Sequence, residues 1–212
     1  MIDIGLQSKL SEIENLNVSS FGQGGARSKK IFENLLLPEG DRFSSGSILN
    51  GSYDAVVIVA GVNDVTNYSG KDFYSFHIMK IVTQLVKCEI LPIIVTIPEF
   101  DVEDCFAVKP WYKRFFIDTP NRILFNENIS DPREKYNEAL KEQLEASGMK
   151  YLLIEFEEFI DDYHSSINLY SNRAHLNREG YIKFGEFIGS EIMDNLDFVR
   201  ANTHDIMVLS EN

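Results

Sequence analysis

The run of apolar residues from Ala55 to Ala60 constrains the fold of this chain more than any other stretch. Four of its six residues are Val or Ile, which favour strands, and six residues are too few for an ordinary helix. A strand that is apolar on both faces belongs inside a parallel sheet that helices cover. Gly61 ends the run, and the short polar side chains of Asn63 and Asp64 follow. At the carboxyl edge of such a sheet, where ligands bind, these residues form either a candidate site or an ordinary turn.

Length and composition predict one soluble α/β domain over residues 1–212. No segment approaches the ~18 uninterrupted apolar residues of a membrane span. The formal net charge of -13 argues against nucleic acid or an anionic membrane as the main partner. Cys88 and Cys105 show no metal-ligand spacing, and Asp3 interrupts the first residues, so no signal peptide is expected. We therefore expect a cytoplasmic protein.

Hydrophobic periodicity predicts the other elements. The first residues form at most a stub of strand over 1–4, followed by two helical turns over 8–16 with Leu10, Ile13 and Leu16 inward. Residues 98–130 lack periodicity and are rich in aromatic side chains, which fits a lid over a pocket or a packed insertion. Further strands are predicted at 17–21, 91–97 and 149–156, and helices at 27–37, 73–87, 131–147 and after residue 177.

The helix that begins near residue 131 has terminal signals at both ends. Asp131 is a candidate cap, Pro132 fits the first turn, and Glu134 completes a capping box. Gly148 is placed to end the helix. These signals fix the limits of the predicted helix.

A glycine-rich turn lies between the strand at 17–21 and the helix at 27–37. Gly22, Gly24 and Gly25 leave backbone N–H groups accessible at a helix N-terminus, which suits an anion or an oxyanion. A plain glycine-rich turn is the alternative. The spacing is not a dinucleotide fingerprint, because the third glycine of that motif is missing.

His175 is the histidine best placed for catalysis. It lies two residues before Asn177, which can cap a helix with an apolar inward face, so His175 falls in a loop near the edge of the sheet and can act as a base. We expect His77, His164 and His204 to be structural or surface residues.

Three short blocks, in this order, resemble those of the SGNH/GDSL hydrolases. Residues Ser20–Gly25 resemble the block Asn-x-Gly-x-x-Gly, with Ser20 in place of Asn. Residues Gly61–Asp64 match the block Gly-x-Asn-Asp. Residues Asn172–Tyr181 resemble Asp-x-x-His-Leu-Asn-x-x-Gly-Tyr, with Asn172 in place of Asp. The resemblance extends from Met1 to about residue 196.

This resemblance implies a flavodoxin-like, three-layer αβα sandwich with a mostly parallel sheet. It also implies a serine hydrolase that cleaves an acyl ester, such as an acetyl ester on a carbohydrate or a small molecule, without a cofactor or metal. The Gly25 N–H and the Asn63 side-chain amide would donate to the oxyanion, and His175 would transfer the proton. Asn172 would hold the His175 ring by a hydrogen bond but would carry no charge.

The Gly-Asp-Ser block that carries the family's nucleophile is not in the sequence. Ser8, in Gly5–Ser8, is one candidate nucleophile. Alternatively the chain begins just past the missing block, with Met1–Asp3 as its continuation and without a complete first strand. The short separation between Ser8 and Gly25 favours this second interpretation. Two other functions stay open, an O-acyltransferase acting on a sugar hydroxyl and a non-catalytic binding protein.

Overall fold

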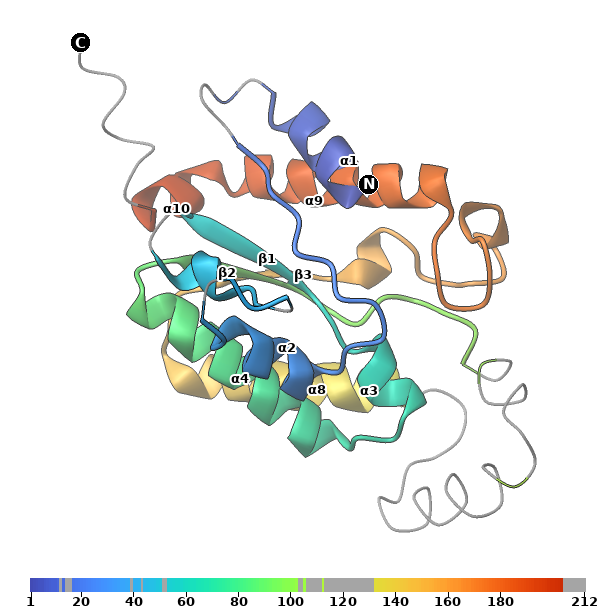
Figure 1. Ribbon diagram of the computed structural model, residues 1–212. Coiled ribbons are helices and arrows are strands. Elements are labelled where there is room, and N and C mark those ends of the chain that lie inside the picture. The colour runs from blue at the N-terminus through green and yellow to red at the C-terminus, as the bar shows by residue number, and fades with distance from the viewer. Residues whose placement is uncertain are drawn as a thin grey trace.

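The structure is a computed structural model that describes residues 1–11, 13, 17–38, 40–42, 44–50, 53–102, 105, 112 and 132–203 (Figure 1). The chain is mixed α/β. Its elements, in chain order, are α1 (Ile2–Lys9), α2 (Ser28–Leu35), the 3-10 helix η1 (Gly46–Asn50), β1 (Ala55–Val59), α3 (Val62–Thr66), α4 (Lys71–Lys87), β2 (Leu91–Val95), α8 (Arg133–Ser147), β3 (Leu152–Ile154), the 3-10 helices η3 (Phe156–Glu158) and η4 (Ile167–Leu169), α9 (Arg178–Asp194) and α10 (Leu196–Ala201).

The described sheet has three parallel strands in the order β1-β2-β3. Val57 of β1 lies opposite Ile93 of β2, and Ile93 lies opposite Leu152 of β3. The strands predicted at 55–60, 91–97 and 149–156 are therefore confirmed, each somewhat shorter than expected. Parallel pairing places the carboxyl ends of all three strands at one edge of the sheet.

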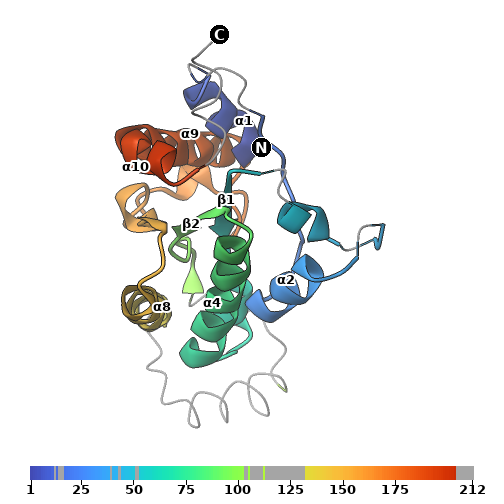
Figure 2. The same cartoon turned by 90° about the vertical axis from the view of Figure 1, so that its left-hand side faces the viewer.

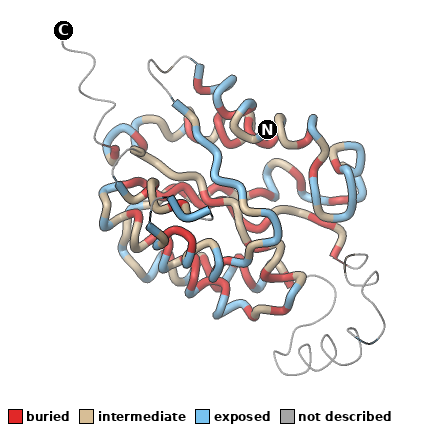
Figure 3. The backbone as a smooth tube through the Cα atoms, in the orientation of Figure 1, coloured by how far each residue is buried: buried red, intermediate tan, exposed pale blue. Residues whose placement is uncertain are grey.

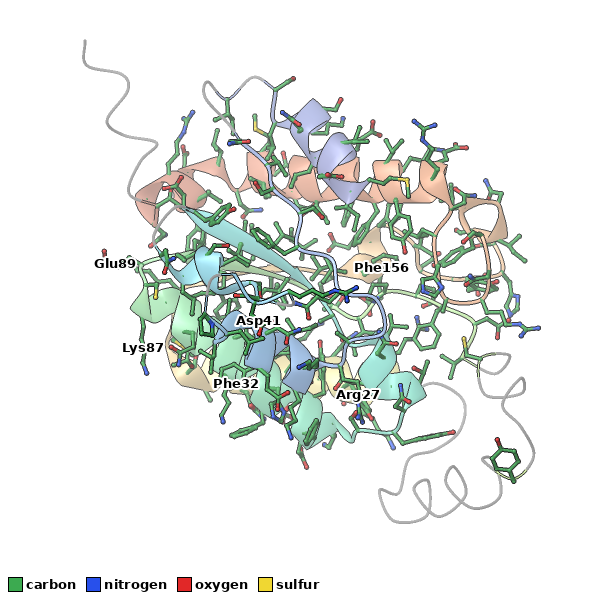
Figure 4. All side chains as sticks on the ribbon, viewed as in Figure 1. Arg27, Phe32, Asp41, Lys87, Glu89 and Phe156 are labelled. Atoms are coloured by element: carbon green, nitrogen blue, oxygen red, sulfur yellow. The ribbon has the colours of Figure 1, made fainter. Side chains whose placement is uncertain are left out.

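Helices cover both faces of this sheet (Figures 1 and 2). On one face α2, α4 and α8 pack against the side of β1 that carries Val56 and Ile58. On the other face α1 and α9 pack over the side that carries Val57 and Val59. Phe156, which follows β3, lies between the sheet and α9 (Figure 4), with its ring 4.9 Å from that of Phe184. The layers form an α/β sandwich, as predicted.

The beginning of the chain differs from the prediction. Residues 2–9 form α1 and not a strand stub. The helix is stabilised by its packing on α9, because a Cβ atom on Gly5 would lie 2.0 Å from the carbonyl oxygen of Ile182. A Cβ atom on Gly185 would lie 2.1 Å from the carbonyl oxygen of Ile2, so the two backbones touch at these glycines. The helix predicted over 8–16 is wrong at its described positions, because α1 ends at Lys9. Leu10 is nevertheless buried, as predicted, Ile13 is partly buried, and residue 16 lies outside the described part of the chain.

The strand predicted at 17–21 is wrong. Residues 17–23 belong to no helix or strand, although Val18 packs against the apolar cluster under α9. An extended segment becomes a strand only when a neighbour accepts its hydrogen bonds, and none of the described strands pairs with this one. Within the described residues, β1 is therefore paired on one edge alone.

The remaining helix predictions are confirmed, with one change at a cap. The helix α4 buries the five predicted positions, which are Tyr74, Ile78, Ile81, Val82 and Leu85. The helix α8 ends at Gly148 in the left-handed conformation (φ 63°). At its start, the N-cap is Pro132 and no side chain caps the helix, while residue 131 lies outside the described residues, as does most of the aromatic stretch 98–130. No described helix combines the length and the apolar character needed to cross a membrane.

Candidate functional site

Asn63 and the glycine-rich loop lie next to each other at the carboxyl edge of the sheet. Asn63 is in α3, the short helix that follows β1 (Figure 1). Its Nδ2 donates a hydrogen bond to the backbone oxygen of Ala26, at 3.1 Å. Ala26 directly follows Gly25, so the structure places the Asn63 side chain against the loop that carries the other predicted oxyanion donor. The Asn63 amide has a second N–H group that this bond leaves available.

Gly61 makes the turn from β1 into α3. Its φ of 124° lies in the region that favours glycine, and a Cβ atom there would come within 2.4 Å of the Ile97 side chain and 3.0 Å of the Tyr74 ring. No other residue fits this position without displacing a buried neighbour. Gly61 thus fixes the direction in which Asn63 leaves the sheet.

A buried hydrogen-bonded pair holds the same two segments together. Ser28, the first residue of α2, donates its backbone N–H to Asp64 Oδ2 at 2.8 Å and its hydroxyl to Oδ1 at 2.7 Å. Both residues are 0% exposed. Burial raises the pKa of the Asp64 carboxyl, and the hydrogen bonds from Ser28 offset part of this effect. The pair ties the start of α2 to α3.

Gly25 has a positive φ of 74° and is exposed at the tip of the loop. A Cβ atom built on it would contact nothing within 4 Å, so its environment is open. Gly25 is the residue whose backbone N–H the sequence predicts as an oxyanion donor, and Ala26, which follows it, contacts the Asn63 side chain. A bound carbonyl oxygen has room to approach this position.

His175 is held by the side chain of Asn172. The His175 Nδ1 atom lies 2.9 Å from Asn172 Oδ1, and the same oxygen accepts hydrogen bonds from the backbone N–H groups of Ala174 and His175, both at 3.0 Å. An amide oxygen only accepts, so Nδ1 carries the proton in the neutral ring. Nε2 is then the basic nitrogen, and the His175 ring is exposed. The predicted hydrogen bond between these residues is present.

The loop that carries His175 is anchored to the segment after β2. The backbone oxygen of Arg173 accepts a hydrogen bond from the Asp101 N–H at 2.8 Å, and the Tyr170 hydroxyl donates to the backbone oxygen of Glu99 at 2.8 Å. Burial and the nearby Glu99 carboxylate raise the pKa of Tyr170, so its hydroxyl remains a donor. Glu99 forms an ion pair with Arg133, and both side chains are 11% exposed. Since Glu99 follows β2 and Asn63 follows β1, both loops lie at the same edge of the sheet.

The structure does not bring Ser8 to this edge. Ser8 is an exposed residue in the last turn of α1, next to Lys9, which packs against Gly189 of α9. Gly189 is eleven residues past the first residue of α9, which corresponds to about 16 Å along the helix. His175 precedes that first residue. Ser8 is therefore far along the helix from the group that would have to activate it.

The other histidines lie away from His175. The ring of His77 is 8% exposed, and its Nδ1 lies 2.7 Å from the backbone oxygen of Phe73 on its own helix. His164 is an exposed residue in the turn after η3, beside Tyr163. The positions of His77 and His164 are structural and superficial respectively, as the sequence predicted. The prediction for His204 falls outside the described residues.

Sequence reasoning missed the role of Ser28. The motif drew attention to Asp64, but its partner is 36 positions earlier in the chain, and nothing in the local sequence identifies it. A serine at the first position of a helix after a glycine-rich turn was the available signal. No group of three or more His, Cys, Asp and Glu side chains is placed to hold a metal ion within the described part of the chain.

Comparison with protein-family models finds no match to the chain, and comparison with curated proteins finds none either. The resemblance of the three blocks to the SGNH/GDSL hydrolases therefore stays a prediction from their residues.

Proposed function

We propose that the chain is an SGNH/GDSL-type esterase or acylhydrolase. The observation that carries the proposal is the hydrogen bond from Asn63 Nδ2 to the Ala26 oxygen, which holds two segments of the motif together next to Gly25. The second support is the His175 ring, whose Nδ1–H is held by Asn172 so that Nε2 is basic. Both lie at the carboxyl edge of a parallel sheet, where ligands bind.

In the proposed reaction an oxygen nucleophile attacks the ester carbonyl, and His175 Nε2 accepts the nucleophile's proton. The Gly25 N–H and the free N–H of the Asn63 amide donate to the oxyanion that forms on the former carbonyl oxygen. His175 then donates the proton to the leaving alcohol. Asn172 stabilises the ring orientation, but its neutral amide stabilises the imidazolium less than a carboxylate would.

Hydrolysis of p-nitrophenyl acetate tests the proposal. We expect wild-type protein to release p-nitrophenol, His175→Ala to lower kcat by at least about a hundredfold, and Asn63→Ala to lower it by about a hundredfold. His164→Ala is the matched control, since it removes an exposed histidine outside the site, and its rate should equal that of the wild type. Loss of activity in His164→Ala, or none in His175→Ala, contradicts the proposal.

The identity of the nucleophile is tested separately. The resemblance implies a serine, and a fluorophosphonate, which phosphorylates active serine hydroxyls, would label it for identification by peptide mass spectrometry. Turnover without labelling would mean that His175 activates water for direct attack on the ester. Labelling of Ser8 would contradict the location proposed for the site.

A non-catalytic binding protein is the second candidate. It is favoured by one observation: among the described residues, the hydroxyl nearest in the hydrogen-bond network, that of Ser171, donates to the backbone oxygen of His175, and no described side-chain hydroxyl is hydrogen-bonded to the His175 ring. A folded protein that hydrolyses neither p-nitrophenyl acetate nor p-nitrophenyl butyrate would support this candidate over the esterase.

A further inference from the structure

A cavity of about 480 Å³ opens beside the glycine-rich loop. Its walls come from that loop, from the outer side of α2, and from the segment that leads into η1. Gly25, the proposed oxyanion donor, is part of the wall, so the cavity adjoins the place where an ester carbonyl would bind. A volume of this size lies within the range of pockets for small ligands.

The cavity is cationic on an acidic protein. Lys30 and Arg42 line it, and no Asp or Glu is among the lining residues that the structure describes, although the chain has 33 acidic and 20 basic residues. Glu33 lies on the same helix as Lys30, with its carboxylate 4.0 Å from the Lys30 amine, in an exposed pair of little strength. Asp41, labelled in Figure 4, precedes Arg42 but does not line the cavity. The local field favours an anion.

The wall also has an aromatic ring and several groups that bind hydroxyls. The Phe21 ring is 42% exposed and is supported edge-on by Tyr53, with the ring centres 5.8 Å apart. Ser20 and Ser45 contribute hydroxyls. Asn34 is 2% exposed and has an Oδ1 atom that accepts no hydrogen bond from the residues that the structure describes.

We propose that this cavity binds an acidic sugar, such as a uronic acid. Lys30 and Arg42 take the carboxylate, Phe21 contacts the apolar face of the ring, and the serine hydroxyls and loop N–H groups take the sugar hydroxyls. Because Gly25 belongs both to the wall of this cavity and to the proposed oxyanion site, we further infer that an acylated acidic sugar is the substrate. That second step rests on the proposed esterase function, whereas the binding step does not.

Isothermal titration calorimetry of the whole chain at low salt tests the binding step. The probes are sodium glucuronate, glucose, which has the ring without the charge, and sodium acetate, which has the charge without the ring. We expect glucuronate to bind at least about tenfold more tightly than glucose, since a charge-assisted hydrogen bond is lost in glucose. Acetate should give no measurable heat.

Three charge-neutralising variants locate the site. Arg42→Gln and Lys30→Gln should each weaken glucuronate binding, by about tenfold and about threefold respectively, while leaving the affinity for glucose unchanged. Lys29→Gln is the matched control, because Lys29 is on the same helix, is exposed and does not line the cavity. Its affinity for glucuronate should equal that of the wild type.

Three results would overturn the binding proposal. They are equal affinities for glucose and glucuronate, an effect of Lys29→Gln as large as that of Lys30→Gln, and the absence of glucuronate binding by protein that circular dichroism shows to be folded. These results would overturn the binding proposal without deciding whether the protein is an esterase. Hydrolysis of p-nitrophenyl acetate without glucuronate binding removes the acidic-sugar proposal alone, and binding without hydrolysis removes the esterase alone.

Discussion

The segment that carries Asn63 and the loop that carries His175 are held in place by different kinds of contact. Asn63 and Asp64 are fixed by bonds to residues of the glycine loop and α2, and the Asp64–Ser28 pair is completely buried. The His175 ring is instead oriented by the side-chain oxygen of Asn172, an exposed residue that precedes it by three positions in the same loop. The oxyanion side of the proposed site therefore depends on the folded core, while the orientation of the base depends on its own loop.

Figure 3 shows the burial of the backbone, with red tube along β2, mostly tan tube along β1, and pale blue at several of the surrounding loops. A substitution near Asn63 should consequently change the stability of the whole domain. A substitution at Asn172 should change the reaction and leave stability nearly unaltered. The predictions below test this difference, beginning with the largest expected effect.

Gly61→Ala should be the most destabilising change. The added methyl group meets Ile97 at 2.4 Å and the Tyr74 ring at 3.0 Å, and φ of 124° is strained for alanine. Steric overlap and backbone strain together predict a loss of about 3 kcal/mol or more in the free energy of unfolding. Urea denaturation of the variant and the wild type measures this difference in the free energy of unfolding. Gly24→Ala is the control, because a Cβ atom there contacts nothing within 4 Å, and it should be nearly neutral.

Asp64→Ala should be the next largest effect. It leaves the backbone N–H and the hydroxyl of Ser28 without their acceptor in a buried place. We expect a loss of about 2 kcal/mol in the free energy of unfolding. Asp64→Asn is the matched variant, since its carboxamide can accept from the Ser28 N–H and donate to the Ser28 hydroxyl. If Asp64→Ala proves as stable as Asp64→Asn, the pair does not hold the two segments together.

The pH dependence of Asp64 sharpens this test. Burial raises the pKa of Asp64 in the folded protein above its ordinary value of 3.8, so the folded state binds the proton more tightly than the unfolded state. The stabilisation that this provides is complete below pH 3.8 and is lost as the pH rises through the folded-state pKa. As the pH rises from about 4 to about 7, urea denaturation should show the free energy of unfolding of Asp64→Asn increasing relative to that of the wild type. A constant difference across this range would contradict the raised pKa.

The sequence predicted most of the sandwich because its signals were local. The apolar faces of α4 and α9 and the run in β1 are visible in periodicity. The failures at 1–4 and at 17–21 have a common cause, since each segment's conformation depends on a distant partner. Gly5 and Gly185, each of which lies against the backbone of the other helix, allow α1 to pack closely on α9, although glycine weakens an isolated helix. The extended residues 17–21 lack the neighbouring strand that would make them part of the sheet.

The candidate site shows the same division. Asn63, Gly25 and His175 were predicted as site residues from short blocks, and the hydrogen bond between His175 and Asn172 was predictable because both residues lie in one block. The partnership of Ser28 with Asp64 was not, because it joins two elements that are remote in sequence. The cationic cavity was also missed, since Lys30 and Arg42 meet only through the folding of the loop before η1.

Asn172→Asp should alter the reaction more than the fold. A carboxylate at this position would accept the same three N–H groups and would also stabilise the imidazolium form of His175. We expect kcat for p-nitrophenyl acetate to rise by about tenfold and the acidic limb of the pH–rate profile to move to higher pH. The urea midpoint should stay within experimental error. A large change in stability with an unchanged pH–rate profile would contradict a role for Asn172 through His175.

The most direct test of the account is whether Asn63 and His175 share one pocket. In protein with Cys88 and Cys105 replaced by Ser, Asn63→Cys and His175→Cys can be combined and treated with dibromobimane, which fluoresces when it bridges two nearby thiols. The account predicts strong fluorescence for this pair and none for Asn63→Cys combined with Ser8→Cys. Folded protein in which both thiols react singly with monobromobimane, but in which the first pair is not bridged, would contradict it.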